Sequence, residues 1–293
     1  MRVRTVLVLT VFLAGCGGSA GSTSSRVDVV AAENVYGNVA SQIGGPHVSV
    51  TSILTNPSAD PHLFEPGTSN GLAVATAKVV LQNGLGYDAF MTRLENASPS
   101  NSRIVVTMAD VLGVHGKDAN PHLWYDVPRL DRMAGSIAAA LERADPRNAS
   151  AYRAGLAQFE RSLGPLRREV ATIRSRHPGA PVAYTEPVPG YLVTAAGLRN
   201  LAPEDFTRPL EEGTEPTPAA VSAMNELVAK HRIRALLYNS QAVSPITGRL
   251  RNAARSAGIP VVPVTETLPP GLTFQQWQLR QAKALAIALE KQR

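Results

Sequence analysis

Two short segments of the chain place a histidine in the same local setting. Residues 60–66 read Asp-Pro-His-Leu-Phe-Glu-Pro and residues 120–126 read Asn-Pro-His-Leu-Trp-Tyr-Asp, so His62 and His122 each lie between a proline and a Leu-aromatic pair. Proline fixes its own φ angle and restricts the residue before it, while the leucine and the aromatic residue anchor the loop in the core. Each imidazole is thus held as a pre-organised ligand would be. A lone loop histidine is more often a surface or hydrogen-bonding residue, but two matched copies favour a shared function.

Two glutamates directly follow predicted strands. Glu186 comes after the run of residues 181–185, and Glu266 comes after the run of residues 260–265. In open parallel sheets, ligands bind at the carboxyl ends of the strands. Either glutamate alone is most simply a loop carboxylate in water, but their matched placement favours a site at this edge.

Short runs rich in β-branched residues recur along the chain, and each is followed by a helical pattern. These runs lie at residues 27–32, 47–54, 79–82, 104–107, 181–185, 235–238 and 260–264. Strands that alternate with helices indicate βαβ units and parallel sheets, and therefore an α/β fold.

A long helical pattern separates the first four runs from the last three. A helix-start signature at residues 145–150 precedes an apolar stripe spaced alternately by three and four positions. The stripe consists of Tyr152, Leu156, Phe159, Leu163, Leu166, Val170 and Ile173. It predicts a connecting helix over residues 146–176 that docks between two domains, with half of a coiled-coil dimer as the alternative. Gly164 and Pro165 lie in its middle and predict a kink or a break.

The N-terminus has the anatomy of a secretory signal. Arg2 and Arg4 precede an apolar run of about ten residues, shorter than the ~20 that a membrane-spanning helix needs. Residues 13–16, Leu-Ala-Gly-Cys, resemble a bacterial lipobox, and Cys16 is the only cysteine of the chain. We expect a signal peptide over residues 1–15, followed over residues 16–26 by a lipidated Cys16 and a flexible tether rich in Gly and Ser.

The composition argues against disulfide bonds and against a nucleic-acid partner. With no second cysteine, disulfides cannot stabilise the fold. The formal net charge of +6 falls by two when Arg2 and Arg4 leave with the signal, and the remaining arginines are scattered. Because no basic platform with interleaved aromatic residues is visible, we expect no nucleic-acid partner. The basic surface is instead expected to be solvated and to face an anionic membrane.

Several segments together resemble the metal-binding receptors of bacterial zinc and manganese ABC importers, solute-binding lipoproteins of the cluster A-I type. These segments are residues 31–38, 43–45, 60–66, 83–88, 120–126, 145–152, 185–191 and 265–268. The resemblance implies two (β/α) lobes with parallel sheets, a metal-binding cleft between them and one long connecting helix. The N-terminal lobe then comprises residues 27–145, the connecting helix residues 146–176 and the C-terminal lobe residues 177–293.

Carried over position by position, the resemblance implies four metal ligands: His62, His122, Glu186 and Glu266. The third ligand is His in zinc-type members and Glu in manganese-type members. The fourth is usually Asp, so the glutamate found here is one methylene longer. A loop that often reads Glu-Ser-Ser in related sequences here begins with an asparagine. Candidates for supporting contacts behind the ligands are Asp60, Asp126 and Asn239.

The function implied by the resemblance is capture of one divalent transition metal, zinc or manganese, and its delivery to the permease subunit of an ABC importer. Ligands from four distant loops would close a site around the ion, whereas catalytic zinc keeps an open position. We therefore expect no enzymatic activity. The enzymatic alternative is a secreted metal hydrolase, but the His-Glu-x-x-His motif of such enzymes is absent from the sequence. A surface adhesin on the same fold is the other alternative.

The sequence is compatible with either of two metals, manganese and zinc. Two imidazoles with two carboxylates suit manganese by ligand hardness, whereas zinc binds more tightly than manganese at almost any site of nitrogen and oxygen ligands. We expect the protein to act as a monomer outside the cytoplasm, in the periplasm or on the outer face of the cytoplasmic membrane. The lipid on Cys16 is expected to anchor it to that membrane.

Overall fold

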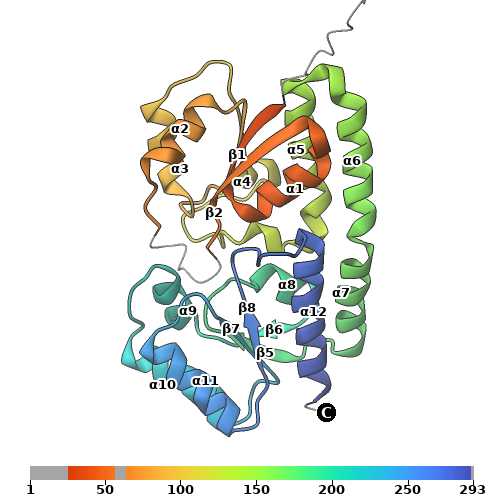
Figure 1. Cartoon of the computed structure of the whole chain (residues 1–293). Coiled ribbons are helices and arrows are strands. Elements are labelled where there is room, and N and C mark those ends of the chain that lie inside the picture. The colour runs from red at the N-terminus through yellow and green to blue at the C-terminus, as the bar shows by residue number, and fades with distance from the viewer. Residues whose placement is uncertain (1–25, 57–63, 292–293) are drawn as a thin grey trace, which may run out of the picture.

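Two separate parallel sheets of four strands each form the centres of two lobes (Figure 1). The structure, a computed structural model, describes residues 26–56 and 64–291. The first sheet has the order β2-β1-β3-β4 and consists of β1 (Val27–Glu33), β2 (Val48–Leu54), β3 (Val79–Gln82) and β4 (Ile104–Thr107). The second sheet has the order β6-β5-β7-β8 and consists of β5 (Pro181–Tyr184), β6 (Arg199–Asn200), β7 (Leu236–Asn239) and β8 (Val261–Val264). The predicted α/β fold with parallel sheets is confirmed.

The strands at the middle of each sheet are almost entirely apolar, because helices cover both of their faces. In the first sheet, Val29, Val30 and Ala31 of β1 pair in register with Val79, Val80 and Leu81 of β3, and all six side chains are buried. Every predicted strand is present with bounds shifted by at most one residue. The short strand β6 was not predicted, since two residues cannot show a hydrophobic pattern.

Helices surround each sheet and leave the carboxyl ends of the strands facing the other lobe (Figure 1). The first lobe has α1 (Asn34–Gly44), α2 (Thr68–Thr76), α3 (Ala89–Ala97), α4 (Met108–Leu112) and α5 (Leu130–Ala144). The second lobe has α8 (Gly190–Ala195), α9 (Glu204–Glu211), α10 (Pro218–Ala229), α11 (Pro245–Ser256) and α12 (Phe274–Glu290). Short 3-10 turns lie at Gly45–His47, Leu123–Tyr125, Val127–Arg129 and Pro146–Asn148. Among the described residues, no helix combines the length and the apolarity that crossing a bilayer requires.

Two consecutive helices run along both lobes at the right edge of Figure 1. Helix α6 (Ala149–Ser162) packs against α1 and α5 of the first lobe, and α7 (Gly164–Arg176) packs against α12 beside the second sheet. The predicted interruption is found at Leu163, between the two helices. Pro165 lies in the first turn of α7, where its missing N–H has no helical acceptor to lose. The apolar stripe is buried within this one chain, apart from the half-buried Leu156.

The last helix also ties the two lobes together. Its first residue, Phe274, donates its backbone N–H to Asn38 Oδ1 of α1 at 2.9 Å. One turn earlier on α1, Asn34 makes two bonds of 2.9 Å with the backbone of Leu268, one as donor and one as acceptor. The side chains of α1 therefore connect the first lobe to segments more than 230 residues away in the sequence.

Candidate metal site

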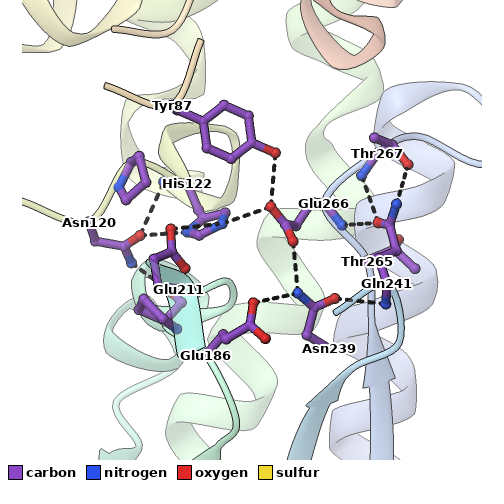
Figure 2. Close-up of polar contacts among 12 residues, drawn as sticks. Tyr87, Asn120, His122, Glu186, Glu211, Asn239, Gln241, Thr265, Glu266 and Thr267 are labelled. Carbon is purple, nitrogen blue, oxygen red and sulfur yellow. Dashed lines mark hydrogen bonds and ion pairs between the residues drawn. The ribbon is translucent and has the colours of Figure 1, made fainter. Parts of the chain in front are cut away.

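His122 is fully buried between the lobes, and its protonation is set by a neighbouring amide (Figure 2). Asn120 donates its amide nitrogen to the carbonyl of Pro187 at 2.7 Å, so its amide oxygen faces His122 Nδ1 at 2.8 Å. An amide oxygen can only accept, which places the ring proton on Nδ1 and leaves Nε2 of the neutral ring as an acceptor. Nε2 lies 3.2 Å from Oε2 of Glu266, which also accepts when ionised. Two acceptors at this distance require a cation between them, either a proton or a metal ion.

Glu266 follows β8 and is 1% exposed. Its backbone N–H donates to Gln241 Oε1 at 2.6 Å, which fixes the loop. Its Oε2 accepts from the phenol of Tyr87 at 2.8 Å, and its Oε1 accepts from the amide of Asn239 at 2.7 Å. The carboxylate is thus held by donors on two sides while Oε2 faces the imidazole.

Glu186 follows β5 and is likewise 1% exposed. Its Oε2 accepts from Asn239 Nδ2 at 2.7 Å, so one amide group of β7 holds both carboxylates, a hydrogen for each (Figure 2). The backbone of Asn239 is in turn fixed by Thr185 Oγ1 at 3.0 Å. Asn239 therefore contacts both Glu186 and Glu266.

Tyr87 reaches the site from a tight turn after β3. Residues 84–86 all have positive φ angles, and a Cβ on Gly84 would lie 2.8 Å from Thr107 Cγ2, so glycine is required there. Burial, followed by the charge on Glu266, raises the pKa of Tyr87 well above its ordinary value. The phenol therefore keeps its proton and acts as a donor to that carboxylate.

Glu211, the last residue of α9, points at the same imidazole from the second lobe (Figure 2). Its Oε1 lies 3.8 Å from His122 Nε2, and its side chain is 12% exposed. A cavity of about 760 Å³ borders the site and is lined by Glu211, Tyr87 and Asn120 among others. Glu211 follows no strand and belongs to no repeated motif, so no sequence pattern indicated it. The roles of Asn120 and Tyr87 were also not predicted.

Two of the predicted site residues, His62 and Asp60, fall outside the described residues. Phe64, just after them, packs against Phe90 with ring centroids 5.0 Å apart. The carboxylate of Asp126 pairs with Arg129, whose guanidinium lies over the ring of Tyr191. Within the described part of the chain, no three His, Cys, Asp or Glu side chains are already spaced to hold a metal ion.

Comparisons with known proteins place the chain beside metal-binding lipoproteins. The manganese-binding lipoprotein MntA of Bacillus subtilis (strain 168) is 30% identical over 180 residues, which cover 57% of this chain and 58% of MntA. The manganese ABC transporter substrate-binding lipoprotein scaA of Streptococcus gordonii is 25% identical over 254 residues, which cover 80% of each chain. The matched part thus spans little more than half of MntA and four-fifths of scaA.

The fold is shared with a solved structure, and a family profile covers most of the chain. The periplasmic zinc binding protein TroA from Treponema pallidum has a TM-score of 0.78 at 17% identity, over 90% of this chain and 99% of that chain. The profile of the family described as zinc-uptake complex component A periplasmic matches residues 29–288. The match extends through both sheets, the connecting helices and the site, and the chain therefore belongs to this family.

Proposed function

We propose that this chain is an extracytoplasmic substrate-binding protein that captures zinc or manganese and delivers it to the permease of an ABC importer. The observation that carries the proposal is the buried pair of acceptors, His122 Nε2 and Glu266 Oε2, 3.2 Å apart. Two ligands of one ion, each about 2.1 Å from it, lie about 3.0–3.4 Å apart. The names of the relatives support a metal as substrate: MntA is called manganese-binding and TroA zinc binding.

The proposed ligands are His62, His122, Glu186 and Glu266. The described three converge from three separate loops, and the amide of Asn239 orients both carboxylates. Asn120 holds the ring of His122 through Nδ1, so that Nε2 faces Glu266. In metal-bound histidines, the ring nitrogen that does not bind the metal usually donates to such an acceptor. The ion is the transported substrate, and the protein's part is to bind and release it.

A binding role is favoured over an enzymatic one. Residues 67–71 have the Gly-x-Ser-x-Gly spacing of hydrolases, but Ser69 is exposed inside α2 and residues 64–67 before it form no strand. A nucleophile elbow needs a strand, a sharp turn and then a helix. The buried carboxylates of Glu186 and Glu266 and the imidazole of His122 support a metal-binding role instead.

The proposed location is the outer face of the membrane, with Cys16 as the lipid-bearing residue; this residue lies outside the described part of the chain. The relatives MntA and scaA are both named lipoproteins. Replacing the lone cysteine in Cys16→Ala is expected to move the protein from the membrane fraction to the soluble fraction without changing metal affinity. Fractionation of cells followed by immunoblotting checks this, and a variant that stays with the membranes contradicts the anchor.

The test of the function is a titration of metal-stripped protein with Zn²⁺ and with Mn²⁺. We expect one ion per chain with a Kd below about 1 μM, or roughly −8 kcal/mol. His122→Ala should weaken binding of both ions at least tenfold, and the exposed His115 gives the matched control His115→Ala with unchanged affinity. If the wild-type chain binds neither ion, the proposed function is wrong.

A further inference from the structure

Glu211 brings a third carboxylate to the buried imidazole. Its Oε1 lies 3.8 Å from His122 Nε2, the same ring nitrogen that Glu266 faces at 3.2 Å. Both carboxylate oxygens of Glu211 are shielded from solvent. The residue comes from α9, an element that supplies none of the ligands proposed above.

The separations fit coordination to one shared ion. Cis ligands about 2.1–2.2 Å from an ion lie about 3.0–3.6 Å apart, depending on the coordination number. The 3.8 Å from Glu211 to the ring nitrogen exceeds this range by only a few tenths of an ångström, which a rotation within a glutamate side chain covers.

The charges of the site point the same way. Glu211 and Glu266 both face one imidazole, and Glu186 shares the amide of Asn239 with Glu266. Buried carboxylates gathered in this way are stabilised by binding a cation. Arg208, one turn earlier on α9, pairs with Asp118 and Glu204, which also line the cavity.

We propose that Glu211 is a further ligand of the captured ion and biases the site toward manganese. Zinc is satisfied by four ligands in a tetrahedral shell, whereas manganese favours six ligands and oxygen donors. An additional carboxylate therefore contributes more to manganese binding than to zinc binding. This inference rests on the proposed function, since it adds a ligand to the same site.

The experiment compares Glu211→Gln with Glu212→Gln, a change at the exposed neighbouring position. Metal-stripped wild-type and variant proteins are titrated with Mn²⁺ and with Zn²⁺, and the Mn²⁺-loaded forms are compared by EPR. We expect Glu211→Gln to weaken Mn²⁺ binding at least tenfold and Zn²⁺ binding less than threefold, with a changed zero-field splitting. Glu212→Gln should match the wild-type protein in all three measurements.

Two results with a folded Glu211→Gln variant would overturn the inference. Unchanged Mn²⁺ affinity in Glu211→Gln shows that the residue is no ligand, and an equal loss for both ions shows that it acts only as a nearby charge. If Glu211→Gln does not fold, as judged by its thermal melt without metal, Glu211→Asp replaces it and must show the same manganese-selective loss. A wild-type protein that binds neither ion is the separate failure of the proposed function itself.

Discussion

At the scale of single residues, two asparagines orient the candidate ligands. Asn239 donates one hydrogen each to Glu186 and Glu266. Asn120 accepts from the ring of His122 and donates to the carbonyl of Pro187, so it connects an imidazole of the first lobe to a loop of the second. A carboxylate in the place of Asn120 would accept from the ring but would repel the carbonyl. The amide is therefore the group that serves both partners.

Removing this amide is expected to weaken metal binding. Asn120→Ala leaves the Nδ1 proton of His122 without its acceptor, and loss of such a supporting contact typically costs 10–100-fold in affinity, which we expect here. Competition titration with a metal indicator measures the change. Asn225→Ala, at an exposed position of α10, is the control. Wild-type affinity in Asn120→Ala would show that the ring needs no support from this residue.

A buried carboxyl behind the site gives a pH-dependent prediction. Glu33, at the end of β1, is 2% exposed, and burial together with the charge of Asp88 raises its pKa well above the ordinary 4.5. Asp88 accepts backbone N–H bonds from Asn83 and Gly84, so Glu33 is the group of this pair that keeps its proton. The stability that protonated Glu33 contributes is complete below pH 4.5 and is lost as the pH rises through its folded-state pKa.

Glu33→Gln cannot ionise and is therefore expected to become increasingly more stable than the wild-type protein as the pH rises above 4.5. Urea unfolding of both proteins at several pH values between 4.5 and 8.5 measures the difference in unfolding free energy. A difference that stays constant or shrinks with rising pH contradicts the assignment.

The candidate ligands that the sequence suggested each lie next to a recognisable pattern. His122 follows a proline in a repeated motif, and Glu186 and Glu266 each come shortly after a strand, so the approach of the two glutamates follows from parallel topology. Glu211 and Asn120 act through the packing of one lobe on the other. No local spacing records that packing, which is why neither role was predicted.

At the scale of secondary-structure elements, the close approach of α6 to α1 depends on one glycine. A Cβ at Gly155 would lie 2.2 Å from the carbonyl oxygen of Ile43, a backbone atom that cannot turn aside. Gly155→Ala is therefore expected to force the helices apart and to lower the unfolding free energy by about 1–3 kcal/mol, in spite of the better helix propensity of alanine.

Gly135 on α5 is the matched control, because a Cβ there meets no atom within 4 Å. Gly135→Ala should be neutral or stabilise the protein by up to about 1 kcal/mol. Chemical denaturation of the two variants checks both signs. Equal stability of Gly155→Ala and the wild-type protein would mean that α6 can move without cost.

The elements themselves were largely predictable. Strands covered on both faces read as runs of Val, Ile and Leu, and the alternate spacing of three and four marked the helix pair α6–α7. The break at Leu163 followed from Pro165, whereas β6 left no pattern to read because it has only two residues.

At the scale of the whole molecule, the two lobes are joined by more than their connecting chain. The α6–α7 pair spans both lobes, and α12 begins at the first lobe with the Phe274–Asn38 bond and packs along α7. Asn34 adds two bonds to Leu268. We expect only small lobe movements on metal loading, because packed helices bend less readily than loop hinges.

Small-angle scattering of the metal-free and metal-loaded protein measures this movement. For residues 27–293 both forms should have a radius of gyration of about 18 Å, differing by less than about 1 Å. A contraction of several ångströms would show a wide clamshell closure, with the break at Leu163 as the first place to examine.

The bonds from α1 to the last tenth of the chain also affect the order in which the protein folds. Contacts of high sequence separation form late, because the loop between them must first be closed. Asn34 and Asn38 emerge early in synthesis, but their partners Leu268 and Phe274 emerge only near its end. The contacts of α1 with the second lobe therefore stay unformed while the second lobe is synthesised. Docking of α12 is then the step that completes the native fold.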